Sequence, residues 1–383
     1  MNEPLPGNKV YNALKNKKCI ILACNPRITI GVAKAVFKAA KDLDSALIME
    51  LARSECNQEG GYTGLTPATF SQSLNKANEE IGHDIWVLHA DHIGVKKGTP
   101  EEMQEIKDMI SAQIEAGYTS FAIDASHLFD FKGKTVEEEL APNIKATIEL
   151  ANFIKEKLAG KDFGLEVEVG EIGRKGSEGM VLTKPEEAVA FIKKLNEAGI
   201  APNLIAIANG STHGNVYDKQ GNLIAQTTID IEQTKAVAKA LRDDKLDVRI
   251  AQHGITGTPL EIIRDKFPHG DILKGNVATL FQNIVFDAIK KHHPDLYREM
   301  FDWTIKNKPI EGKKADEIFG TNGKHAVSVF FGKIYSMSDK CKQEVEEKAY
   351  EAACGHIKAF KAEGSASIVR KFTRKQNIKN QEV

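Results

Sequence analysis

Short apolar runs alternate with longer amphipathic segments along most of this chain. Apolar runs of this length are typical of buried strands in parallel sheets. We predict strands at residues 19–24, 46–51, 85–88, 121–123, 165–169, 204–208, 248–251 and 272–277. The segments between them have helical spacing of apolar positions, which predicts helices at 30–43, 67–81, 100–116, 136–158, 185–198, 229–241, 259–266 and 278–292.

Eight strand–helix units in succession predict an α/β protein with a TIM (β/α)8 barrel. Proline at residues 67, 100, 185 and 259 suits the first turn of a helix and supports these boundaries. A doubly wound open sheet is the alternative. It is less favoured because neither a G-x-G-x-x-G motif nor a G-x-x-x-x-G-K-[ST] motif follows the first strand.

The barrel is expected to span residues 19–299, between a polar lead-in at 1–18 and a C-terminal helical extension at 300–383. Within the extension, residues 339–360 have the pattern of one amphipathic helix. The basic tail at 370–379 is interpreted as a frayed, solvated end. A contact with another subunit or with a phosphate is the alternative for this tail.

The composition excludes several classes of protein and of binding partner. The 383 residues contain 52 basic and 53 acidic side chains, so no net charge attracts nucleic acid or a membrane surface. No apolar run is long enough to span a bilayer, and the first residues do not resemble a secretion signal. The five cysteines are unsuited to a disulfide framework or a zinc ribbon. We therefore expect a soluble cytoplasmic protein with reduced thiols.

Polar and titratable side chains stand at the ends of the predicted strands. In a barrel the carboxyl ends of all strands meet at one rim, where the chemistry of this fold is found. The side chains concerned are Asn25, His89, Asp91, His92, Asp124, Ser126, His127, Glu166, Glu168, Asn209, His213, Gln252, His253, Lys274 and Asn276.

Three histidines from different strands, His92, His213 and His253, could meet a carboxylate at this rim. Imidazoles with a carboxylate are typical zinc ligands, and a catalytic site keeps one position open. The alternative for each histidine is a hydrogen-bonded rim side chain. Asp91 precedes His92 and would point to the opposite face of a regular strand. It is interpreted as a proton carrier beside the metal, or as a carboxylate that orients a histidine.

Two glycine-rich turns, at residues 210–214 and 254–257, follow the sixth and seventh strands. Glycine lets backbone N–H groups approach a ligand closely, so these turns, with Thr256 and Thr279, could hold a phosphate. Tight turns without a ligand also need glycine, and this interpretation stays open.

Six motifs through the barrel resemble those of the class II, metal-dependent fructose- or tagatose-bisphosphate aldolases. They are His89-Ala-Asp-His92, Ile123-Asp-Ala-Ser-His127, Glu166-Val-Glu-Val-Gly-Glu-Ile-Gly173, Gly210-Ser-Thr-His-Gly214, His253-Gly-Ile-Thr-Gly257 and Lys274-Gly-Asn-Val-Ala-Thr279. Their common order along the chain makes the set far more specific than any single motif.

The resemblance implies a role for each matching residue. His92, His213 and His253, with Glu168 nearby, would hold one zinc ion. Asp91 would exchange a proton with the C4 hydroxyl of a ketose phosphate, and Asn276 would steady the enediolate. Glu178 falls in the segment that matches the catalytic loop of the family. The expected substrate and phosphate contacts are Asn25, Gly214, Gly254, Thr256, Lys274 and Thr279.

The resemblance further implies cleavage or formation of a ketose bisphosphate such as fructose 1,6-bisphosphate. It also implies a monovalent cation and a homo-oligomer, either a dimer or a tetramer. Ile255 replaces a glycine of the phosphate loop, and Ala278 replaces an acidic residue of some members. The C-terminal arginine that binds the far phosphate in part of the family has no match. These departures leave open whether the substrate is a symmetric bisphosphate.

A second segment, Asn57-Gln-Glu-Gly-Gly-Tyr-Thr-Gly-Leu-Thr-Pro67, is similar to a signature of the Z-type accessory subunits of tagatose-bisphosphate aldolase. Two alternatives follow: a non-catalytic stabilising subunit of an aldolase complex, and a metal-dependent sugar epimerase. Retention of the apparent ligand set favours a catalytic chain.

Overall fold

The eight predicted strands form a closed, entirely parallel barrel in the computed structural model, which describes residues 3–171, 175–176, 179–212, 214–218 and 220–381. The strands are β1 (Ile21–Cys24), β2 (Leu47–Ala52), β3 (Trp86–Gly94), β4 (Ser120–Asp124), β5 (Gly164–Glu168), β8 (Leu204–Ala206), β11 (Arg249–Gln252) and β12 (Ile272–Val277). Around the barrel the order is β1-β12-β11-β8-β5-β4-β3-β2, so each strand pairs with its neighbour in the chain and β12 closes onto β1. The predicted TIM barrel is confirmed.

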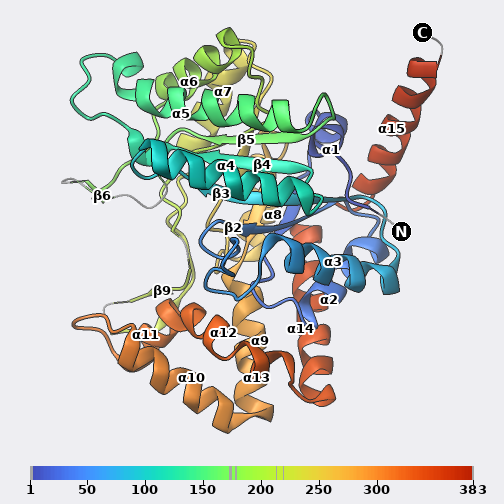
Figure 1. Cartoon of the computed structure of the whole chain (residues 1–383), viewed down its shortest axis with the longest axis vertical. Coiled ribbons are helices and arrows are strands. Elements are labelled where there is room, and N and C mark those ends of the chain that lie inside the picture. Colours follow the sequence, from blue (N-terminus) through green and yellow to red (C-terminus); the bar gives the residue numbers. More distant parts are fainter. Residues whose placement is uncertain (1–2, 172–174, 177–178, 213, 219, 382–383) are drawn as a thin grey trace.

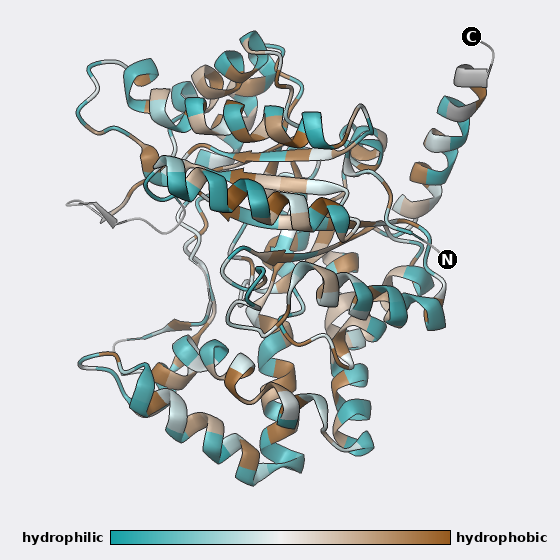
Figure 2. Ribbon diagram, in the orientation of Figure 1, coloured by the Kyte–Doolittle hydropathy of each residue, from teal (hydrophilic) through white to brown (hydrophobic). Residues whose placement is uncertain are grey.

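A helix follows each barrel strand and covers the outside of the sheet (Figure 1). These helices are α2 (Val32–Asp42), α3 (Pro67–Ile81), α4 (Pro100–Glu115), α5 (Val136–Lys157), α6 (Pro185–Glu197), α7 (Ile231–Asp243), α8 (Leu260–Lys266) and α9 (Thr279–His292). Thr66, Thr99 and Thr135 cap α3, α4 and α5 by accepting a hydrogen bond from a first-turn N–H group. Apolar side chains of the helices pack against the barrel, while hydrophilic residues mark their outer faces (Figure 2).

A helix that the sequence pattern did not predict, α1 (Gly7–Leu14), packs at the amino-terminal end of the barrel. The Gly7 N–H group donates to the Thr119 carbonyl at 3.0 Å, and the Tyr11 hydroxyl lies 3.0 Å from Ser120 Oγ. The close packing of α1 against the barrel depends on Gly164, where a Cβ atom would collide with both Ser120 and Tyr11. The segment was expected to be a polar lead-in, because α1 is too short for its apolar face to stand out from its surroundings.

The C-terminal extension consists of helices, including the predicted one at 339–360. They are α10 (Pro294–Asn307), α11 (Ala315–Asn322), η2 (Gly323–His325), α12 (Ala326–Val329), α13 (Phe331–Tyr335), α14 (Asp339–Ala359) and α15 (Ser365–Gln381). Helices α10 to α13 gather in the lower part of the view, where α10 packs against α9, and α14 packs against α2 and α9 (Figure 1). Two short hairpins complete the fold: β6 (Lys175–Gly176) with β7 (Gly179–Met180), and β9 (Val216–Tyr217) with β10 (Leu223–Ile224).

The prediction of a frayed tail is wrong, because residues 365–381 form the helix α15. Arg370 anchors it to the body of the protein: its guanidinium donates to both carboxylate oxygens of Asp84, at 2.6 and 2.7 Å, and to Asp44 at 2.6 Å. Among the described residues, no helix combines the length and the apolar character that a bilayer crossing requires.

Candidate functional site

A bulge in β3 turns two adjacent residues, Asp91 and His92, toward the same pocket. Between the pairs Ala90–Phe121 and Ile93–Ile123, β3 contains one more residue than β4. His92 takes up the extra residue with a φ of 39°, a value uncommon outside glycine. The strand therefore runs to Gly94 instead of ending before His89. The expectation that Asp91 and His92 face opposite sides holds only for a regular strand.

The pocket lies at the carboxyl ends of the barrel strands and has a volume of about 310 Å³. It brings together most of the residues that the sequence predicted for the site: Asn25, Asp91, His92, Glu168, Gly214, His253, Gly254, Thr256, Asn276 and Thr279. His213 and Glu178, also predicted, lie outside the described residues. Lys274 is fully buried and does not line the pocket.

The two described histidines of the predicted metal site face each other. His92 Nε2 lies 2.9 Å from His253 Nδ1. Two nitrogens on one tetrahedral zinc ion are about 3.3 Å apart, as follows from bonds of about 2.05 Å. The remaining ring nitrogens contact carboxylates: His92 Nδ1 is 3.1 Å from Glu168, and His253 Nε2 is 2.8 Å from Glu166. Carboxylates in these positions orient metal-binding imidazoles and fix their tautomers.

Two carboxyl groups beside His92 differ in their affinity for a proton. Burial raises the pKa of Glu168 to about 7, and the nearby Asp124 adds to the increase. For Asp124, burial alone would raise the pKa, but the contacts with His92 and Ser126 lower it to about 2. Asp124 lies 3.4 Å from His92 Nδ1 and is ionised, while Glu168 can hold a proton near neutral pH.

Lys274 sits at the centre of the barrel and holds three carboxylates around its ammonium group. The distances from Nζ are 2.7 Å to Glu166, 2.9 Å to Glu50 and 3.2 Å to Asp91. Burial alone would raise the pKa of Asp91, but the charges of Lys274, His92 and His253 lower it well below its usual range. Asp91 is therefore an ionised carboxylate whose position is fixed, beside the histidine pair.

Asn276 connects the Asp91 carboxylate to a second buried acid, Glu50. Its amide Nδ2 donates to Glu50 at 2.5 Å and to Asp91 at 3.2 Å. Burial, together with the charge of Asp91, raises the pKa of Glu50 well above its usual range, which favours the protonated form. One member of this carboxyl pair thus carries a proton while the other is ionised, an arrangement suited to acid–base chemistry.

A chain of polar groups continues from the histidine pair toward α1. Beyond Glu166, His89 Nε2 lies 3.4 Å from the carboxylate, and His89 Nδ1 lies 2.8 Å from Ser120 Oγ. Burial and the charge of Lys274 lower the pKa of His89 to about 4, so the imidazole is neutral. The Ser120 hydroxyl then meets Tyr11. These contacts fix the side chains that lie between the site and α1.

On the opposite side of the pocket, Glu55 gathers the loops that follow β1 and β2. Its carboxylate accepts hydrogen bonds from Arg27 Nε at 2.7 Å, Asn25 Nδ2 at 2.5 Å and the Tyr62 hydroxyl at 2.6 Å. Tyr62 belongs to the glycine-rich segment at 57–67, which this network holds against the rim. Arg27 also donates to the Thr279 hydroxyl at 3.2 Å.

Several site residues were missed by the sequence reasoning. Glu50 offered a signal, because it is an acid within an apolar strand. Arg27 offered another, since it follows Asn25 closely at the end of the first strand. Lys324, which lines the pocket from the C-terminal extension, offered none, because nothing in its local sequence indicates that η2 folds over the rim.

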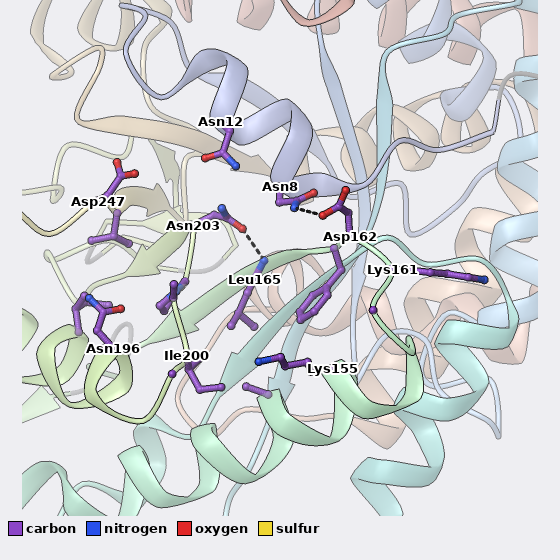
Figure 3. A pocket seen from close by; sticks show the side chains of 18 residues that line it. Asn8, Asn12, Lys155, Lys161, Asp162, Leu165, Asn196, Ile200, Asn203 and Asp247 are labelled. Carbon is purple, nitrogen blue, oxygen red and sulfur yellow. Dashed lines mark hydrogen bonds between the residues drawn. The ribbon is translucent and has the colours of Figure 1, made fainter. Parts of the chain in front are cut away.

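A second cavity, of about 490 Å³, lies at the amino-terminal end of the barrel (Figure 3). Two of its polar side chains are bonded within the protein: Asn8 Nδ2 donates to Asp162 at 3.0 Å, and Asn203 Oδ1 accepts from the Leu165 N–H group at 3.0 Å. In TIM barrels this end contributes to stability, while the carboxyl end carries the active site. The candidate site is therefore the smaller pocket.

Comparison with known proteins identifies the family of the chain. The family model for class II fructose-bisphosphate aldolases matches residues 6–364. The chain belongs to this family. The match covers the barrel and most of the extension.

The relatives found by sequence comparison have low identity to this chain. The D-tagatose-1,6-bisphosphate aldolase subunit GatZ of Escherichia coli O6:H1 is 23% identical over 285 residues, which cover 69% of this chain and 64% of that protein. This aldolase-family chain thus spans less than two thirds of that curated relative.

Solved structures share the fold. The YdjI aldolase from Escherichia coli K12 superimposes with a TM-score of 0.59 at 19% identity, over 95% of this chain and 99% of that one. Fructose-bisphosphate aldolase from Campylobacter jejuni gives a TM-score of 0.60 at 18% identity, over 95% and 97% of the two chains. At these identities the likeness shows the fold alone.

Proposed function

We propose that this chain is a zinc-dependent class II aldolase that cleaves or forms a ketose phosphate. The observation that carries the proposal is the pair of facing nitrogens, His92 Nε2 and His253 Nδ1, beside the ionised carboxylate of Asp91. The donor set fits a divalent metal, because each imidazole offers one nitrogen to the pocket while a carboxylate contacts the other. His213 would complete the ligand set, as the family motif implies, with Glu168 close by.

The bound metal would act as a Lewis acid toward the charge that develops on the substrate oxygen during C–C cleavage. The protein residues have separate tasks. Asp91 accepts the proton of the C4 hydroxyl, and Asn276 holds the Asp91 carboxylate in place. Gly254, Thr256 and Thr279 lie where a phosphate of the substrate would bind. Lys274 keeps Asp91 and Glu166 ionised and positioned, a role that replaces the direct phosphate contact expected of it.

The runner-up is a non-catalytic stabilising subunit of an aldolase complex. The observation that favours it is the similarity to GatZ, together with the glycine-rich segment at 57–67. The candidate acid–base and ligand groups that the described pocket brings together, Asp91, His92 and His253, favour catalysis instead. A metal-dependent epimerase would use the same groups without breaking a C–C bond. A homo-oligomer and a cytoplasmic location stay predictions.

Turnover of fructose 1,6-bisphosphate by metal-free protein, with and without added zinc, separates these functions. Triose phosphates that form only after zinc is restored would support the aldolase. An isomeric ketose phosphate as the sole product would identify an epimerase. If the protein has no activity alone but a partner aldolase becomes active when the two are mixed, the chain is the accessory subunit. Zinc-loaded protein that converts none of a panel of ketose phosphates would contradict the proposal.

A further inference from the structure

Two hydroxyl groups meet inside the barrel, at the end opposite to the candidate site. One belongs to Tyr11 in α1 and the other to Ser120, the first residue of β4, and both side chains are buried. Their oxygens lie 3.0 Å apart. Withdrawing a hydroxyl from water costs free energy unless it is hydrogen-bonded. The pair satisfies this requirement, and it also begins a series of contacts that leads to the candidate metal site.

The backbone around Ser120 leaves room for its hydroxyl. A Cβ atom at Gly164 would lie 2.4 Å from Ser120 Oγ, and a Cβ atom at Gly7 would lie 2.8 Å from the same oxygen. Either side chain would displace the hydroxyl from its position between Tyr11 and β4, because non-bonded heavy atoms do not approach so closely. Two glycines, one in α1 and one in β5, therefore leave the space that the Ser120 hydroxyl occupies.

From Ser120 a buried polar network, formed by Tyr11, Ser120, His89 and Glu166, extends to His253. Ser120 Oγ lies 2.8 Å from His89 Nδ1. The other nitrogen of that ring, Nε2, faces Glu166 Oε2 at 3.4 Å, so this link is mainly electrostatic. Glu166 Oε1 lies 2.8 Å from His253 Nε2. The network thus connects α1 to the side of the His253 ring that faces away from His92.

The positions of the protons give the polar network one direction. Burial raises the pKa of Tyr11, so its hydroxyl keeps its proton, and Ser120 Oγ is the only acceptor it has among the described residues. Tyr11 therefore donates to Ser120, and the Ser120 hydroxyl is left to donate to His89 Nδ1. Burial and the charge of Lys274 lower the pKa of His89 to about 4. The single proton of this neutral imidazole then lies on Nε2, where it faces Glu166.

This proton arrangement fixes the Glu166 carboxylate behind His253. Lys274 Nζ donates to Glu166 Oε2 at 2.7 Å, and the His89 N–H group faces the same oxygen. A carboxylate fixed in this way keeps the proton of His253 on Nε2 and leaves Nδ1, which faces His92, free to bind a cation. If the proton of His89 moved to Nδ1, a lone pair would face Glu166 Oε2 and repel it.

We infer that Tyr11 and Ser120 are positioning residues for the candidate zinc site, because they hold the His89 tautomer that keeps Glu166 in place behind His253. Helix α1 is then part of the support of the metal, although it packs at the opposite end of the barrel. The inference rests on the zinc site of the proposed function, but its test needs no turnover. It gives the Tyr11 hydroxyl an effect on metal affinity that packing of the ring alone would not have.

The test is a titration of zinc into the full-length protein in competition with a chromogenic chelator. Tyr11→Phe removes one hydroxyl and keeps the ring, and Ser120→Ala removes the hydroxyl at the centre of the polar network. Tyr118→Phe is the matched control, because the Tyr118 hydroxyl belongs to an equally buried side chain but contacts Cys56 Sγ, at 4.0 Å, outside the polar network. Melting temperatures of the metal-free proteins establish that each variant is folded.

We expect Ser120→Ala to weaken zinc binding about tenfold, the lower end of the usual effect of losing a contact that orients a metal ligand. Tyr11→Phe, one contact further from the metal, should weaken it at least about threefold, and Tyr118→Phe should stay within about twofold of the wild type. The double variant should bind zinc no more weakly than Ser120→Ala alone, because both changes interrupt the same network. With Co²⁺ in place of zinc, the visible absorption bands report the ligand geometry. They should shift in Tyr11→Phe and not in Tyr118→Phe.

Unchanged zinc affinity in Tyr11→Phe and Ser120→Ala, or equal losses in Tyr11→Phe and Tyr118→Phe, would overturn the inference. Additive losses in the double variant would also overturn it, since they would show that the two hydroxyls act separately. The proposed function fails in a different way. If zinc affinity depends on Tyr11 but the zinc-loaded protein cleaves no ketose phosphate, the positioning role stands and the aldolase assignment falls. If the wild type binds no zinc, both fall.

Discussion

His92 Nε2 and His253 Nδ1 lie 2.9 Å apart, although 161 positions separate the two residues in the chain. One comes from β3 and the other follows β11, so only a closed barrel brings them together. Two imidazole nitrogens at this distance, each with a carboxylate on the far side of its ring, form a site prepared for a cation.

Zinc should therefore stabilise the folded protein through this pair. We expect the melting temperature of metal-free protein to rise when zinc is added, because a ligand that binds only the folded state favours it. His253→Ala should abolish most of the rise. His269→Ala is the control, since His269 lies elsewhere and contacts the Ala359 carbonyl. An undiminished rise in His253→Ala would exclude this site.

The positive φ of His92 predicts an unusual order of stability among variants. His92→Gly should be about 1 kcal/mol more stable than His92→Ala, because glycine adopts this conformation without strain. Both variants lack the imidazole, so their difference reports the backbone alone. Urea denaturation gives the measurement. If His92→Ala is the more stable of the two, the bulge does not strain the chain at this position.

Lys274 contacts three buried carboxyl groups and balances the two ionised ones, Asp91 and Glu166, so its removal should be strongly destabilising. We expect Lys274→Met to lose about 3–5 kcal/mol of unfolding free energy, because it leaves uncompensated charges in the core. Part of the loss should be recovered at lower pH, where the carboxylates protonate. Lys333→Met, at an exposed position, should change stability by less than about 0.5 kcal/mol. Similar stabilities of the two variants would contradict the central role of Lys274.

The contact that holds α15 should depend on pH. The hydrogen bonds from Arg370 lower the pKa of Asp84, and for Asp44 the contacts with Ser367 and Arg370 outweigh the effect of burial, so its pKa is lowered too. A lowered carboxyl pKa stabilises the fold above the unfolded value of about 3.9. This stabilisation is lost as the pH falls through the folded value.

Arg370→Met should accordingly reduce stability by roughly 1 kcal/mol near neutral pH, a modest figure because both acids are partly exposed. The difference from the wild type should shrink below about pH 4. Arg374→Met, on the same helix but exposed, should have little effect at any pH. Urea denaturation across this range provides the measurement, and a difference that stays constant in acid would show that the ion pairs do not anchor the helix.

The sequence predicted the barrel well because its strands are buried on both faces and give continuous apolar runs. The strand ends then indicated most of the pocket, from Asn25 to Thr279. Alternation could not explain how Asp91 and His92 share a pocket, because a bulge leaves no clear trace in one sequence. Lys324 could not be predicted for another reason, because its position depends on contacts between η2 and loops that are distant in the sequence. Helix α15 was missed because its polar composition resembles that of a solvated tail.

The most direct test of the central claim compares zinc content and cleavage in the same samples of wild type and Asp91→Asn. Asparagine keeps the shape of the side chain but cannot accept the proton. We expect Asp91→Asn to retain zinc near the wild-type stoichiometry and to lose roughly 10²–10⁴-fold in kcat for ketose phosphate cleavage, the usual contribution of a general base. Wild-type turnover by zinc-loaded Asp91→Asn would contradict the account.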